Sequence, residues 1–195
     1  MNGIPLLLLF IYSCITINVV LQCALGINGI AESKRPVSKS SFVKSAIIFL
    51  SVIILWFLFS KIIYSLVSGI FIYILLFPVS AVLYKGVEYL IFLYIIKDEE
   101  QAESFISFPE GIIAAAVFIC INIANSFLEV VILSLGFSAG LFLVNFIIWE
   151  IRRRAALEAV PVFLRGKPLI LIAMGLLSLV FTTASFLLFR MINAG

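Results

Sequence analysis

The chain contains no histidine, and its three cysteines include no C-x-x-C pair. Histidine nitrogens and cysteine thiolates are the usual ligands of zinc and haem, so a zinc or haem site built by this chain alone is excluded. A lipid-modifying enzyme is disfavoured as well, because neither a pair of acids at catalytic spacing nor a Ser or Cys beside a base is present. Cys14, Cys23 and Cys120 all fall in apolar runs, where cysteine ordinarily serves as a small packing residue.

Charged residues make up only 12% of the 195 residues, whereas hydrophobic residues make up 64%. The apolar residues gather in six runs, each long enough to cross roughly 30 Å of hydrocarbon as a helix. The runs are residues 5–27, 42–67, 69–96, 106–125, 130–151 and 168–191. The first lacks a basic leader and a small-x-small cleavage site, so we expect it to remain as a span. The links between the runs are short, which leaves no soluble domain for a nucleotide or a large substrate.

Ten of the thirteen Lys and Arg residues lie in or beside the gaps that follow the first, third and fifth runs. They are Lys34, Arg35, Lys39, Lys44, Lys97, Arg152, Arg153, Arg154, Arg165 and Lys167. Basic residues gather on the cytoplasmic side of membrane proteins, so both termini are expected on the outer side of a cell inner membrane. Acids in the gap at residues 97–103 contribute little to this rule. The net charge of +3 therefore indicates topology rather than a nucleic-acid partner.

Six spans divide into two halves, residues 1–97 and 98–195, and three spans per half force any internal repeat to be inverted. The stretch Cys14-Ile-Thr-Ile-Asn18 in the first span resembles Cys120-Ile-Asn-Ile-Ala124 in the fourth. Gly, Pro and polar residues interrupt the same two spans at residues 26–29 and 109–111, although such clusters also mark ordinary helix ends. The sequence thus predicts a single all-α membrane domain of six transmembrane helices in two inverted three-helix repeats, with its termini outside.

Polar residues inside the spans are the candidate site, because an ionisable group at membrane depth is costly and usually faces a cavity, a partner or a pathway. Lys85 and Glu88 stand at i and i+3 in the third span, close enough to pair. Asn18 and Gln22 are i,i+4 neighbours in the first span. We interpret these four residues as an ion path or intramembrane polar site. The alternatives are a structural ion pair and ordinary interhelical amide bonds, to which other amides can add: Asn122, Asn125 and Asn145.

Four linked elements in the C-terminal half form a pattern found in a known family. They are Gly136-Phe-Ser-Ala-Gly140, Glu150-Ile-Arg-Arg153, Val160-Pro161 with Leu164-Arg-Gly166, and residues 169–177. The N-terminal half adds looser matches at Asn18, Leu25-Gly26, Ser33-Lys34-Arg35 and Glu88. In order and spacing the chain resembles the small six-helix membrane subunits shared by the Rnf ferredoxin:NAD oxidoreductase and the sodium-translocating NADH:quinone reductase. The similarity is to their RnfA and NqrE branch.

The resemblance implies a non-catalytic membrane subunit of an ion-translocating electron-transport complex, paired with a homologous subunit. In that family, the first and fourth helices each supply one cysteine to a [2Fe-2S] cluster shared with the partner. The corresponding positions here are Asn28 and Ala115, neither of which can supply a thiolate. Cys23 and Cys120 lie five residues away from these positions and are the candidates for a displaced cluster.

Two hypotheses follow from these observations. The first is a diverged Rnf/Nqr-type subunit that keeps scaffold and ion-path roles for Na⁺ or H⁺ but binds no cluster. The second is a stand-alone small secondary transporter or channel-like protein that uses the region of Lys85 and Glu88. Co-purification distinguishes them, because a subunit brings partner chains whereas a transporter runs as a homo-oligomer.

Overall fold

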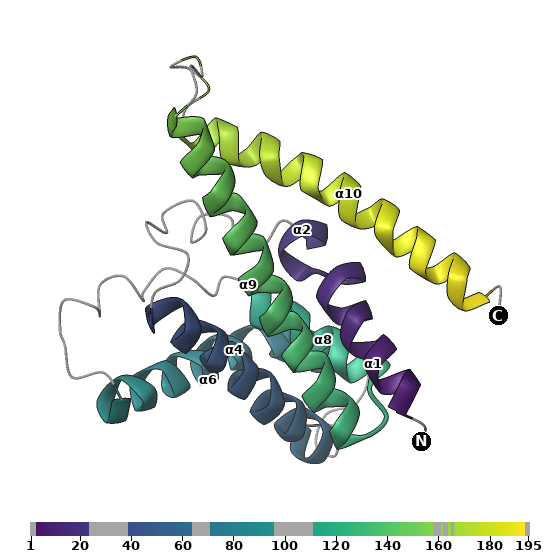
Figure 1. Ribbon diagram of the computed structural model, residues 1–195. Coiled ribbons are helices and arrows are strands. Elements are labelled where there is room, and N and C mark those ends of the chain that lie inside the picture. Colours follow the sequence, from purple (N-terminus) through teal and green to yellow (C-terminus); the bar gives the residue numbers. More distant parts are fainter. Residues whose placement is uncertain are drawn as a thin grey trace.

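The computed structural model describes residues 3–23, 39–63, 71–95, 111–157, 161, 164 and 166–193. All regular secondary structure in these ranges is helical, as the sequence predicts (Figure 1). The helices are α1 (Gly3–Ile11), η1 (Tyr12–Thr16), α2 (Val19–Cys23), α4 (Lys39–Leu58), η2 (Phe59–Ile63), α6 (Phe71–Ile95), α8 (Ile112–Ile123), α9 (Phe127–Leu157) and α10 (Lys167–Asn193). Each lies in or largely in one of the predicted apolar runs.

Two of these helices contain a segment that is long and apolar enough to cross a membrane. The segments are Phe127–Ala156 in α9 and Lys167–Leu187 in α10, whereas the other described helices contain shorter apolar stretches. Half of the most apolar part of α9 is buried in the protein, against 17% of that of α10. A helix this apolar and this exposed requires an apolar environment, which supports membrane association.

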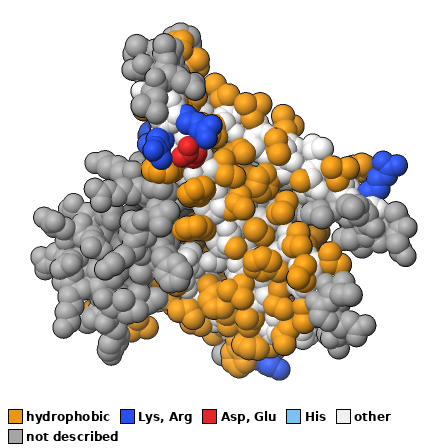
Figure 2. Space-filling view, in the orientation of Figure 1, with side chains coloured by type: hydrophobic (Ala, Val, Ile, Leu, Met, Phe, Trp, Pro, Cys, Tyr) orange, Lys and Arg blue, Asp and Glu red, His pale blue; other side chains and the backbone are white. Residues whose placement is uncertain are grey.

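The surface of the described part is largely apolar. Figure 2 shows hydrophobic side chains across most of the described surface of the visible face, with basic and acidic side chains near the upper end of α9 and further basic side chains at the right and lower edges. Exposed large apolar residues come from every long helix, for example Phe57, Phe77, Phe146 and Phe186. A soluble protein rarely exposes so much contiguous apolar surface, so this distribution agrees with a lipid-facing exterior.

The long helix α9 lies at the centre of the fold. It packs against α1 and η1 along one side and against α4 along another, while α8 packs against α4 and α6. The helix α10 packs against η1, α2 and α9 at the periphery. In Figure 1, α1 and α9 run in one direction and α4 and α10 run in the other, whereas α6 is inclined across them.

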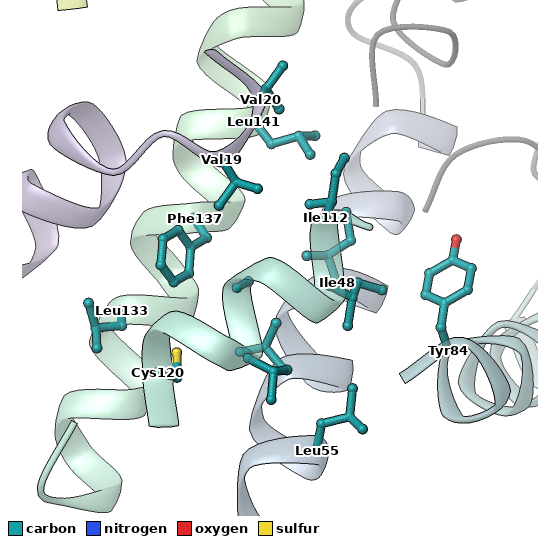
Figure 3. Packing of buried hydrophobic residues seen from close by; sticks show 14 of the residues in the cluster. Val19, Val20, Ile48, Leu55, Tyr84, Ile112, Cys120, Leu133, Phe137 and Leu141 are labelled. Atoms are coloured by element: carbon teal, nitrogen blue, oxygen red, sulfur yellow. The ribbon is translucent and has the colours of Figure 1, made fainter. Parts of the chain in front are cut away.

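Buried aliphatic and aromatic side chains from α2, α4, α8 and α9 form one core. Figure 3 shows part of it, with Val19 and Val20 near Leu141, and Cys120 near Leu133. Leu55 of α4 and Phe59 of η2 have no exposed surface. The core therefore joins segments from both halves of the chain rather than forming one core in each half.

A side-chain cap separates α8 from α9. Glu129, which is 8% exposed, accepts a hydrogen bond from the backbone N–H of Asn125 at 2.8 Å, and Ser126 Oγ accepts one from the Glu129 N–H at 3.4 Å. The Ser-x-x-Glu spacing is the sequence signature of a capping box. The cap provides partners for amides that a new helix would otherwise leave unpaired.

Replacing Glu129 with Ala removes this cap and leaves the Asn125 amide without its acceptor. We expect the free energy of unfolding to fall by about 1 to 2 kcal/mol, measured by denaturation in mixed detergent micelles. Glu150→Ala is the matched control, because Glu150 forms ion pairs with the exposed side chains of Arg153 and Arg154. Such pairs contribute less than about 1 kcal/mol. Equal losses in the two variants would contradict the role of the cap.

Candidate functional site

The first helix is interrupted well before the glycines at residues 26–29. After Ile11 the α-helix becomes the π-helical segment η1, which ends at Ile17 with φ −104° and ψ 47°, and the chain resumes as α2 at Val19. No Gly or Pro lies in this stretch. The interruption predicted at residues 26–29 falls outside the described residues. Because π-helical turns are costly and concentrate at functional sites, the break at Ile17 is the first candidate feature.

Asn18 bridges the two sides of this break. Its Nδ2 donates a hydrogen bond to the Cys14 carbonyl at 3.1 Å, and its Oδ1 accepts one from the Leu21 N–H at 3.3 Å. The side chain thereby ends one helical segment and caps the next. Asn18 is only 2% exposed, so both hydrogen bonds form inside the protein. The sequence identified this residue as an intramembrane polar group but did not predict that it sits at a helix break.

Two glycines of α9 press against the break. A Cβ at Gly140 would lie 2.7 Å from the Cys14 carbonyl oxygen and 2.9 Å from Asn18 Nδ2. A Cβ at Gly136 would overlap Ser13 Oγ and lie 2.9 Å from the Phe10 carbonyl oxygen. Glycines at i and i+4 let two helix backbones approach closely, which is the common small-residue packing of membrane helices. We call the group formed by Ser13, Cys14, Asn18, Gly136 and Gly140 the break site.

Short polar side chains extend from the break site along α9. Ser13 is fully buried and donates to the Phe10 carbonyl at 3.0 Å. On α9, Ser138 donates to the Ser45 carbonyl of α4 at 3.2 Å. The glycines of α9 thus face the first helix while Ser138 reaches α4. The break site consequently lies where the first helix and α4 share α9 as a neighbour.

Gln22 lies on the other side of α2, towards α10. It is exposed, and its Nε2 donates to Thr182 Oγ1 at 3.3 Å. Thr182 in turn donates to the Ser178 carbonyl of its own helix at 2.8 Å. Asn18 and Gln22 are therefore one turn apart along the chain but differ in environment, since one is enclosed beside α9 and the other bridges to a peripheral helix.

Lys85 lies apart from the break site. It is exposed on α6, with its Nζ 5.9 Å from the centre of the Tyr84 ring. The helix α6 packs on α4 and α8, whereas the break site packs on α9 and near α10. The Glu88 side chain falls outside the described residues, so its pairing with Lys85 stays a prediction. The four polar residues that the sequence singles out do not all belong to one interface.

The described cysteines are packing residues of the protein interior. Cys14 and Cys120 are both buried, and Cys120 has no exposed surface and lies near Leu133 between α8 and α9 (Figure 3). Ala115 is half-buried on α8. The Cys23 side chain and Asn28 fall outside the described residues. Within those residues, no group of three or more His, Cys, Asp or Glu side chains is placed to hold a metal ion.

The fourth-span helix α8 has unusual ends as well. Gly111 precedes it with φ +84°, a conformation that favours glycine, close to the interruption predicted at residues 109–111. The helix stops at Ala124, which is extended and whose N–H donates to the Cys120 carbonyl at 2.9 Å. In the first helix, the Cys14 carbonyl accepts from Asn18 instead. The two stretches that resemble each other in sequence therefore both end a helical segment within four residues of a cysteine.

The sequence analysis did not predict that Gly136 and Gly140 pack closely against another helix or that Ser13 is buried. The i,i+4 spacing of the two glycines was visible, and it is the signal that could have revealed a close helix contact. The sequence does not indicate which helix these glycines pack against. Ser13 carries no comparable signal, because a lone serine in an apolar run has no characteristic spacing.

Comparison with known proteins adds no further constraint on the site. No protein-family model matches the chain, and no curated protein matches it. The similarity to Rnf and Nqr membrane subunits stays a hypothesis that rests on the sequence motifs.

The close approach of α9 to the break site predicts a sharp difference between two glycine substitutions. In Gly140→Ala the new methyl meets backbone that cannot move aside, so we expect a loss of about 1 to 3 kcal/mol in unfolding free energy. Gly175→Ala on α10 is the control, because no atom lies within 4 Å of its Cβ position. Alanine favours helix over glycine by up to about 1 kcal/mol. Equal stability of the two variants, measured in micelles, would refute the close approach.

Proposed function

We propose that the chain is a membrane subunit of an Rnf/Nqr-type ion-translocating electron-transport complex that has lost the intramembrane iron–sulfur ligands. In this proposal it is not a catalytic subunit. Its two inverted halves meet along α4 and α9, and the break site belongs to the ion path. The motifs shared with the RnfA and NqrE branch support the choice of complex, and the packing of the helices supports the inverted arrangement.

The observation that carries the proposal is that the helix contacts keep their pattern when the two halves are exchanged. The exchange replaces the first helix (α1, η1 and α2) by α8, α4 by α9, and α6 by α10. Under it, the contact of the first helix with α9 corresponds to that of α8 with α4, and the contact of α4 with α6 corresponds to that of α9 with α10. The contact of α6 with α8 corresponds to that of α10 with η1, and the α4–α9 and α2–α8 contacts are unchanged by the exchange. This is the relation expected between inverted repeats that share a pseudo-two-fold axis.

One contact departs from the exchange pattern, and the chain connectivity explains it. The helices α8 and α9 pack on each other, whereas the first helix and α4 have no comparable contact among the principal ones. The turn at residues 124–126 joins α8 to α9 directly, so the end of α8 must lie beside the start of α9. Residues 24–38 separate α2 from α4 and impose no such constraint.

The broken helices support an ion path at the repeat interface. Proteins that move ions place their sites near mid-membrane, where interrupted helices expose backbone groups. Here the leading helix of each half is interrupted or shortened, and Asn18 supplies an amide at the break. Gln22, which bridges to Thr182, supplies a second amide one turn further on. We infer that these two side chains line the path for Na⁺ or H⁺.

The residues present do not fit the cluster of the family. Ala115 offers no ligand, and the Cys120 thiol is enclosed between α8 and α9. A thiolate that shares a cluster with another subunit must reach the surface of its own subunit, and thiolate ligands are what such clusters need. The proposal therefore gives this chain a scaffold and ion-path role and no role as an electron carrier.

A stand-alone transporter is the second candidate, and the enclosed cysteine favours it. If no cluster can be held, the break site and the inverted halves would suffice for a secondary transporter or channel-like protein without redox partners. Mild-detergent purification from native membranes separates the two functions. Co-purification with flavin- and iron-containing chains supports the subunit, whereas a homo-oligomer alone supports the transporter.

Replacing Gln22 with Leu tests the ion path without disturbing the core, because Gln22 is exposed. We expect redox-driven Na⁺ or H⁺ uptake by membrane vesicles to fall about tenfold, since the lost polar contact to an ion is worth roughly 1.5 to 3 kcal/mol. Asn122→Leu is the control, because Asn122 is exposed and bonds only to the Phe118 carbonyl among the described contacts. Normal uptake by the Gln22 variant would exclude this residue from the path.

Metal analysis tests the absence of the cluster. The chain, purified anaerobically together with its membrane partner, should contain no iron or acid-labile sulfide at their shared interface, because Ala115 and an enclosed Cys120 do not supply accessible thiolates. Stoichiometric iron that disappears in a Cys23→Ser, Cys120→Ser double variant would show that a displaced cluster exists. Iron that persists in this variant belongs to other chains.

A further inference from the structure

One side of α9 carries Phe127, Ser138 and Asn145, which are separated by eleven and seven residues and therefore by whole numbers of helical turns. This side is turned to α4. The Phe127 ring lies 6.5 Å from the ring of Trp56, and Ser138 donates a hydrogen bond to the Ser45 carbonyl at 3.2 Å. The glycines of the break site stand two residues before and two residues after Ser138, so they lie on the opposite side of α9.

The contact between α4 and α9, which we call the seam, opens towards the basic end of α9 at residues 152–154. In Figure 1 the two helices meet where α4 ends and α9 begins, and they diverge in the other direction. Asn145 lies two turns beyond Ser138 towards the basic end, whereas α4, which begins at Lys39, reaches less than two turns beyond Ser45. Asn145 is therefore at the open end of the seam, at the level where α4 begins.

The side-chain amide of Asn145 is enclosed without a hydrogen-bond partner. The residue is only 8% exposed, and its side chain forms no hydrogen bond within the described part of the chain. By contrast, Asn18 and Asn122 each donate to the carbonyl four residues earlier, at 3.1 Å and 2.7 Å. A buried amide that leaves all its donors and its acceptor unpaired is costly unless water reaches it.

The depth of Asn145 makes this cost larger. At a rise of about 1.5 Å per residue, Asn145 lies roughly 16 Å from the basic end of the apolar segment Phe127–Ala156. The hydrocarbon layer is roughly 30 Å thick, so the amide lies near its middle. Lipid tails have no hydrogen-bonding groups, and polar groups at this depth require protein or water as a partner.

The other end of the seam is closed. The rings of Trp56 and Phe127 meet there, and Leu133 has no exposed surface. Ser134 is also fully buried, but it donates to the Val131 carbonyl of its own helix at 2.9 Å. Ser134 therefore needs no water, whereas the unpaired amide lies at the open end.

We propose that water fills a crevice between α4 and α9, which is entered from the basic end of α9 and ends at the amide of Asn145. The amide offers two donors and an acceptor to this water, whereas lipid, the alternative occupant, offers it no partner. The crevice brings the aqueous phase to the interface between the two halves of the chain. It lies on the opposite side of α9 from the break site and does not depend on the electron-transport assignment.

The test measures how fast a charged methanethiosulfonate reagent modifies single introduced cysteines in the full chain, held in lipid nanodiscs with both faces open to the reagent. Asn145→Cys should react about tenfold faster than Val144→Cys and Phe146→Cys, because the reactive thiolate and the charged reagent both need water. Val144 has no exposed surface, and Phe146 is 45% exposed on the apolar exterior. Labelling is counted above that of the wild-type chain, in which Cys14 and Cys120 are buried.

Two outcomes would overturn the proposal. If Asn145→Cys reacts as slowly as Val144→Cys, the seam is dry. If Phe146→Cys reacts as fast as Asn145→Cys, the exterior of α9 itself meets water and no crevice is present.

A measurement on the wild-type chain guards against a misfolded variant. Radicals formed from water by X-ray irradiation oxidise side chains beside bound water, so Leu141, one turn before Asn145, should be oxidised several times faster than Leu133. Both leucines are buried, at 6% and 0% exposed, so contact with the exterior does not distinguish them. Equal oxidation of the two leucines would also contradict a water-filled crevice.

Discussion

The close contact of α9 with the first helix is the constraint on which the other helix positions depend. Gly136 and Gly140 bring the backbone of α9 against the carbonyls of Phe10 and Cys14, where no larger residue fits. Because α9 also packs on α4, the spacing at the glycines determines how far the two halves of the chain lie apart. The core between α4, α8 and α9 closes around that spacing, with side chains such as Leu133 fully buried. The contact at the two glycines therefore packs two helices together and also holds the two halves of the chain at a fixed distance.

The same contact explains why a helix break without Gly or Pro persists. A π-helical turn and a non-helical residue leave backbone groups unpaired, which is expensive in an apolar environment. Asn18 pairs two of these groups, and it is only 2% exposed beside Gly140. If α9 lay further away, the amide would face lipid and the break would lose its enclosure. Function and stability are thus coupled at one residue, since the amide proposed for the ion path also maintains the backbone conformation.

The sequence alone determined that the chain is helical and approximately where each helix lies, because long apolar runs admit little else. It also predicted an interruption at residues 109–111, where Gly111 precedes α8 with φ +84°. The cap of α9 by Ser126 and Glu129 was not predicted, although it depends on neighbouring residues only. Only the tertiary structure decided that the first helix breaks at Ile17, that Asn18 is enclosed while Gln22 bridges to α10, and that Lys85 lies at another interface. The physical reason is that the length of an apolar run determines the length of a helix. A break without Gly or Pro depends instead on contact with the α9 backbone, which lies more than a hundred residues away along the chain and cannot be read from neighbouring residues.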